Sequence, residues 1–94
     1  MAADLDERIE ATLIALLAAR SPASSICPSE VARALAPHDE AAWRALMPRV
    51  RTVAARLAAR GQLRITRRGA TLDPERLGRG PIRLHAPDSG PIKG

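Results

Sequence analysis

The chain has 94 residues, with fourteen arginines and one lysine against ten acidic residues, a formal net charge of +5 and a single cysteine. This length accommodates one small domain, one cysteine excludes an intramolecular disulfide, and one cysteine with two histidines lacks the spacing of a metal site. The acidic start excludes the basic region of a signal peptide, and no apolar stretch approaches the ~18 residues of a membrane span. We therefore expect a cytoplasmic protein with no membrane partner, no metal and no cofactor.

The charges are unevenly divided along the chain. The first 40 residues contain three arginines and seven acids, a formal charge of −4, whereas the remaining 54 contain twelve basic and three acidic residues, a formal charge of +9. Between residues 41 and 72 there are eight arginines and no acid. A one-sided positive field attracts polyanions, so nucleic acid is the first partner to consider.

Three helices are expected in the first two thirds of the chain. Apolar residues at helical spacing and acids in the first turn predict a helix from about residue 4 to 20. Pro28 suits the start of a second helix of about eight residues, which Pro37 ends. Asp39 is the expected cap of a third helix, about residues 40–60, in which Pro48 is expected to kink or break the helix. Its core stripe lies within roughly 60° of Val50 on a helical projection and comprises Trp43, Leu46, Met47, Val50, Val53, Ala54 and Leu57.

After Gly61 the apolar residues alternate, which is typical of strands. Leu63 and Ile65 mark one strand, residues 67–69 a turn, residues 70–73 an antiparallel return, and residues 82–85 a further strand. Residues 26–27 predict one more very short strand. This order indicates an α+β, mostly helical fold, a winged helix-turn-helix of three helices and a small antiparallel sheet. We expect this domain over residues 4–85 and a flexible C-terminal tail over residues 86–94.

Several segments resemble an uncharacterised bacterial family of small winged-helix-like domains. They are Ile26-Cys27-Pro28-Ser29-Glu30-Val31-Ala32-Arg33, Trp43-Arg44-x-Leu46-Met47, Val50-Arg51 and Gly80-Pro81-Ile82-Arg83. The resemblance covers residues 9–84, roughly. It implies a winged-helix fold, a domain of unknown function, and no catalytic or binding residues that could be transferred to this chain.

Arginines on the third helix and at the tip of the wing are the candidate DNA-binding residues. On the third helix, Arg44 and Arg51 flank the core stripe on one side, and Arg49 and Arg56 flank it on the other. Arg67 and Arg68 lie at the expected tip of the wing. The arginine fork pairs with phosphate or guanine. We expect a nucleic-acid-binding domain, a candidate transcriptional regulator, that binds duplex DNA. The alternative is that these arginines are a solvated surface in an arginine-rich composition.

The outermost face of the third helix is poor in groups that read bases. It carries Ala45, Pro48, Thr52, Ala55 and Ala59, of which only Thr52 can hydrogen-bond to a base edge. Binding through the phosphate backbone is therefore expected. The same small face suits helix packing, so a protein-interaction or homodimerisation module without DNA binding remains the alternative.

Cys27 is the one residue whose side chain is a candidate for redox or nucleophilic reactivity. Its position before Pro28 makes it the candidate N-cap of the second helix, where a thiol pKa is lowered and redox sensing becomes conceivable. The alternative is a small buried structural residue. His38 and His85 are expected at the surface or at an edge rather than as ligands. No catalytic arrangement and no small-molecule substrate are evident, so an enzyme is not expected.

Overall fold

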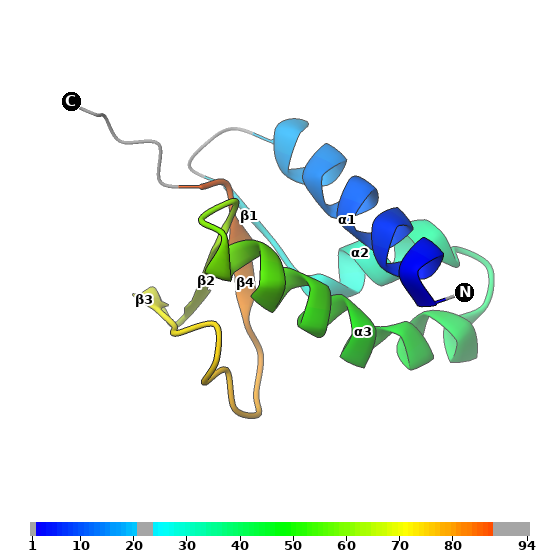
Figure 1. Cartoon of the computed structure of the whole chain (residues 1–94). Helices are drawn as coiled ribbons and strands as arrows, with labels where there is room; N and C mark the ends of the chain where they lie inside the picture. The colour runs from blue at the N-terminus through cyan, green and yellow to red at the C-terminus, as the bar shows by residue number, and fades with distance from the viewer. Residues whose placement is uncertain (1, 21–23, 88–94) are drawn as a thin grey trace.

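Three helices pack on one face of an antiparallel sheet in the computed structural model, which describes residues 2–20 and 24–87 (Figure 1). The described elements are α1 (Ala2–Ala18), β1 (Ser25–Ile26), α2 (Pro28–Leu35), α3 (Glu40–Ala59), β2 (Arg64–Arg67), β3 (Ala70–Thr71) and β4 (Arg83–His85). The strand order is β1-β4-β2-β3. The predicted α+β class and the predicted order of helices and strands are confirmed.

Strand β4 lies between β1 and β2 and sets the register of the sheet. Leu84 is opposite Ile26 of β1 and opposite Ile65 of β2, and all three side chains are buried in the core. Because side chains alternate along a strand, their neighbours face the other way. The sheet therefore has an inner, apolar face toward the helices and an outer, polar face.

The first helix supplies one wall of the core. Ile9, Leu13 and Leu17 recur every four residues and are buried, which places one apolar stripe against the rest of the core. The helix ends at Ala18, two residues before the predicted end, and Arg20 N–H donates to the Leu17 carbonyl there.

The second helix begins where the sequence predicts. Cys27 has an extended backbone and is the N-cap, Pro28 follows it, and Glu30 reaches back to accept a hydrogen bond from Cys27 N–H at 2.9 Å. Strand β1 ends at Ile26 rather than at the predicted residue 27, because the Cys27 N–H is bound to Glu30 instead of to a neighbouring strand. Val31 and Ala32 then face the core.

The third helix is continuous through Pro48 from residue 40 to 59, so of the two outcomes predicted there, a kink or a break, the break does not occur. Pro48 is exposed, so water can satisfy the Arg44 carbonyl that loses its intrahelical donor.

Asp39 caps the third helix, accepting from Ala42 N–H at 3.0 Å, as predicted. Within the predicted stripe, Val50, Val53, Ala54 and Leu57 are buried, and Trp43, Leu46 and Met47 are partly buried against them.

Residues 68–82, here called the hairpin arm, connect β2 to β4 (Figure 1). The arm turns first at Arg68 and Gly69, which both have positive φ, a conformation that glycine adopts without cost. The short strand β3 then pairs antiparallel with β2. Ile82 returns to the core just before β4 begins.

The predicted tail of residues 86–94 lies largely outside the described residues. Ala86 and Pro87 are described, and they line a cleft of about 180 Å³ together with the end of α1. In the described ranges, no helix combines the length and apolar character needed to cross a membrane.

Candidate nucleic-acid interface

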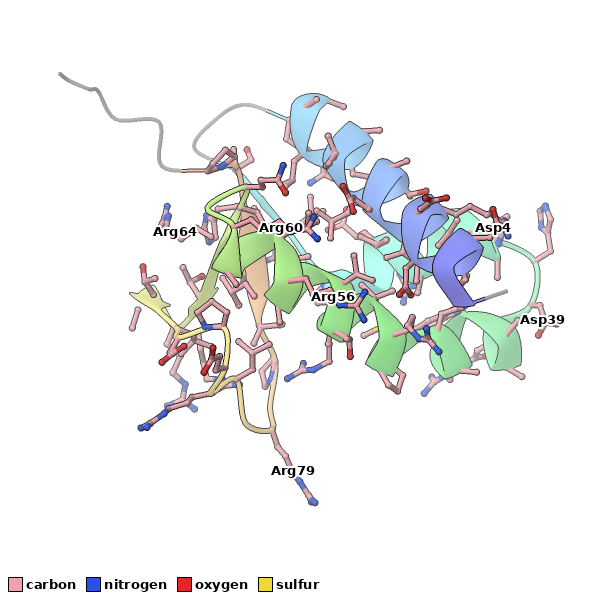
Figure 2. The ribbon with its side chains drawn as sticks, viewed as in Figure 1. Asp4, Asp39, Arg56, Arg60, Arg64 and Arg79 are labelled. Atoms are coloured by element: carbon pink, nitrogen blue, oxygen red, sulfur yellow. The ribbon has the colours of Figure 1, made fainter. Side chains whose placement is uncertain are left out.

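The arginines on one flank of α3 face α1. Arg49 Nη1 lies 3.1 Å from Asp6 Oδ1, and Arg56 Nη1 lies 2.9 Å from Asp6 Oδ2. Figure 2 shows Arg56 extending from α3 on the side of α1. The hydrogen bond from Arg56 holds the pKa of the Asp6 carboxyl below its ordinary value, against the opposing effect of burial and with further help from Arg49. These two arginines therefore join α1 to α3.

Two further candidate arginines, Arg51 and Arg67, donate hydrogen bonds to backbone carbonyls of the hairpin arm. Arg51 of α3 donates to the carbonyls of Gly80 and Gly78, at 3.1 and 3.2 Å. Arg67 of β2 donates from Nη2 to the Leu77 carbonyl at 2.7 Å, and from Nε to the Pro81 carbonyl at 3.1 Å. A guanidinium presents several donors in a fixed plane, which suits an irregular loop whose carbonyls have no strand partner.

Arg44 remains available to an external partner. It pairs with Glu40 one helical turn earlier, Nη2 to Oε2 at 2.6 Å, and both side chains are 66% exposed. Exposed pairs of this kind contribute little, so a phosphate can replace Glu40. Arg33 of α2 and Arg44 both stack on the Trp43 ring, 4.7 and 5.2 Å from its centroid. Trp43, predicted as a core anchor, is partly buried and also holds these two cations.

The hairpin arm carries the other available arginines. Arg68 is exposed in the turn, as predicted, and Arg76 and Arg79 are exposed further along. Within the described residues, these three have no hydrogen bond or ion pair to another side chain. Figure 2 shows Arg79 projecting from the arm away from the body of the protein. Sequence reasoning missed Arg76 and Arg79, because they follow two acids, Asp73 and Glu75, and so lie beyond the acid-free stretch.

The outward face of α3 offers little for reading bases. Ala45, Pro48, Thr52 and Ala59 are exposed, and Ala55 is half-buried. The Thr52 hydroxyl donates to the Pro48 carbonyl at 3.0 Å. Thr52, the residue on this face whose side chain is able to hydrogen-bond to a base edge, thus donates its hydroxyl proton within its own helix.

Cys27 is half-buried, and Ser29 Oγ donates to its Sγ at 3.1 Å. His38 is exposed, whereas His85 is half-buried and lies on the sheet. Across residues 2–20 and 24–87, no three His, Cys, Asp or Glu side chains are grouped as metal ligands would be.

Residues 6–87 match the sequence profile of a family described as protein of unknown function, DUF3253. The chain belongs to the DUF3253 family. No curated protein matches the chain. The DUF3253 match begins at Asp6 and includes all six candidate arginines, together with the arm that two of them brace. Membership confirms an uncharacterised domain family.

Proposed function

We propose that this chain is a winged helix-turn-helix domain that binds nucleic acid, duplex DNA, mainly through the phosphate backbone. Support for the fold comes from the element order, from the short turn of residues 36–39 between α2 and α3, and from the hairpin arm in the place of a wing. A role in DNA binding would place the protein in the cytoplasm.

The observation that carries the proposal is the distribution of exposed arginines that neither Asp6 nor the carbonyls of the arm engage. Asp6 and the carbonyls of the arm engage four of the six candidates, Arg49, Arg56, Arg51 and Arg67. The exposed arginines that remain on the proposed helix-turn-helix and wing are Arg33, Arg44, Arg60, Arg68, Arg76 and Arg79. In a winged helix, α3 enters the major groove and the wing contacts the adjacent backbone or minor groove.

The proposed mechanism is counterion release. Arginines that neutralise phosphates displace condensed cations, so affinity falls steeply as salt rises. The alanine-rich outer face of α3 permits close approach to the groove but supplies no set of base-reading donors and acceptors. The phosphate contacts would therefore position the domain without specifying a sequence.

The test is fluorescence anisotropy with a random duplex of about 25 base pairs, titrated at several salt concentrations. Arg79→Gln is compared with Arg8→Gln, which removes the same charge from the exposed side of α1. Arg79→Gln should lower the salt slope by about 0.9 for the one phosphate that it no longer neutralises, and Arg8→Gln should leave the slope nearly unchanged. Absent binding at low salt, or equal reductions in both variants, would overturn the proposal.

A protein-interaction module is the second candidate, and one observation favours it. Ile14 of α1 is 44% exposed and lines the apolar cleft beside Pro87. This side chain and the cleft beside it form a small apolar surface on which a protein partner could dock. Sedimentation at low and high salt separates the candidates, since a salt-independent dimer weakened by Ile14→Ser would favour this second function.

A further inference from the structure

The outer face of the sheet gathers cationic and polar side chains into one group. Arg64 of β2 lies opposite His85 of β4, which lies opposite Ser25 of β1. Thr66 and Arg83 form the next opposed pair. Since Ile65 and Leu84 point into the core, these five residues share the face away from the helices. Figure 2 shows Arg64 extending from the sheet on the side away from α1 and α3.

Most of these polar groups bind one another. Thr66 Oγ1 lies 2.8 Å from His85 Nε2, and Thr66 is 3% exposed. Arg83 donates from Nε to Ser25 Oγ at 2.9 Å and from Nη2 to the Ser25 carbonyl at 3.1 Å. These bonds fix the imidazole and one guanidinium on the sheet.

Arg64 is the exception. Its Nε is buried, and within the described residues it has no hydrogen-bond partner. Leaving a buried donor of a charged group unsatisfied costs free energy, and such groups are rare in folded proteins. An anion that draws the half-buried Arg64 side chain outward would supply the acceptor that this Nε lacks.

The charge around His85 also favours an anion. Burial lowers the pKa of His85, and the neighbouring charges of Arg64 and Arg83 lower it further. Glu30, on which the charge of Arg83 acts, already binds Arg20 and the Cys27 N–H. No acidic side chain in the described residues pairs with Arg64.

We propose that the outer face of the sheet binds a phosphate group, held by Arg64 and His85. A guanidinium takes a tetrahedral oxyanion with two parallel hydrogen bonds, and Nε is one of its donors. A protonated imidazole donates from both nitrogens: Nε2 to Thr66 Oγ1, and Nδ1 to the bound anion. Anion binding and protonation of His85 therefore favour each other. This site is separate from the α3 surface and does not rest on the proposed function.

The test follows the ring signals of His85 by NMR while pH is varied. Sulfate is the probe, because it keeps its double charge across the range, about pH 5 to 8, in which histidine titrates. Sodium chloride at matched ionic strength controls for simple screening of the two arginines. In wild-type protein, sulfate should raise the pKa of His85 more than chloride does, and sulfate affinity should rise as pH falls.

Arg64→Gln and Arg8→Gln remove the same charge from different surfaces, the second from the exposed side of α1. Arg64→Gln should weaken sulfate binding at least about tenfold, the loss of one charge-assisted hydrogen bond or more. Arg8→Gln should bind sulfate like wild type. If Arg64→Gln does not fold, Arg64→Lys keeps the charge, lacks the planar fork and should still bind less tightly. Equal His85 responses in sulfate and chloride, or equal sulfate binding by wild type and the Arg64 variant, would overturn the proposal.

Two further titrations identify the source of the phosphate. Inorganic phosphate that moves the His85 signals, together with a duplex that leaves them unchanged, would assign the site to a small phosphorylated molecule. A duplex that displaces sulfate from His85 would assign it to the nucleic-acid backbone. If neither moves the His85 signals, the phosphate assignment is wrong.

Discussion

Asp6 of α1 and Arg56 of α3 are 50 residues apart in the sequence and form an ion pair, with 2.9 Å between Oδ2 and Nη1. The second oxygen of the same carboxylate accepts from Arg49. One acid therefore joins the first helix to the third and offsets one of the two positive charges on this flank of the proposed DNA-binding helix. The Asp6 side chain is only 18% exposed, so water does not readily replace either arginine.

Replacing Asp6 with Asn should have two opposite effects. The melting temperature should fall, because the link between α1 and α3 loses its charge. Affinity for duplex DNA should rise and its salt dependence should steepen, because Arg49 and Arg56 are released to neutralise phosphates. Thermal melts and anisotropy titrations measure the two effects. Asp4→Asn, an exposed change on the same helix, is the control and should leave stability and binding nearly unchanged.

The stabilising effect of Asp6 should depend on pH. Because its folded-state pKa is lowered, its contribution is complete above the pKa of the unfolded carboxyl, about 4, and is lost as pH falls through the folded-state value. The difference in melting temperature between wild type and Asp6→Asn should therefore shrink below about pH 4. A difference that stays constant down to about pH 2 would show that the ion pairs are not its cause.

Local signals predicted the helix starts and the strands well. The capping bonds at the starts of α2 and α3 each join residues three apart, Cys27 with Glu30 and Asp39 with Ala42. The spacing of the apolar residues shows which face of an element is buried. Both signals can be read from a short stretch of sequence. The cap at Cys27 was also predicted, but its effect on the end of β1 was not. That effect requires the Glu30 carboxylate to take the Cys27 N–H from the sheet.

The roles of the arginines were not readable in this way. A helical projection separates Arg49 and Arg56 from Arg44 and Arg51, but it cannot say which flank α1 covers. The contacts that decide this span 27 to 50 residues, so they depend on the packed fold. Arg67 looked like a free residue at a turn, yet carbonyls of the arm hold it.

The hydrogen bonds from Arg67 to the carbonyls of the arm should contribute to stability independently of its charge. Arg67→Lys keeps the positive charge but cannot reach Leu77 and Pro81 with one planar group. We expect a loss of about 1–2 kcal/mol in the free energy of unfolding, the net worth of one or two hydrogen bonds. Hydrogen exchange at residues 77–82 should also become faster. Arg68→Lys, next to it and exposed, should change neither.

Glu30 should stabilise the start of α2. Its carboxylate accepts from Cys27 N–H and pairs with Arg20, and the first of these bonds is the main reason that its pKa is lowered. Glu30→Ala should cost about 1 kcal/mol, as the loss of a helix cap does. Because the folded-state pKa is lowered, the cost should be complete above the unfolded value of about 4.3 and should shrink as pH falls through the folded value below it, where Glu30 becomes protonated. Chemical denaturation at neutral and at low pH measures it, and a loss that persists at low pH would contradict this role.

Pro48 lies inside α3 and should make the helix less stable than its core packing allows. Pro48→Ala restores an N–H that can donate to the Arg44 carbonyl and removes the ring, a change worth about 3 kcal/mol in a helix interior. The added freedom of the unfolded chain offsets about 0.4–1 kcal/mol of this gain. We therefore expect a net stabilisation of about 2 kcal/mol by chemical denaturation. Pro37→Ala, in the turn after α2, should show no such gain, because no intrahelical bond is restored. If Pro48→Ala were neutral or destabilising, the ring would have to make contacts that stabilise α3 directly.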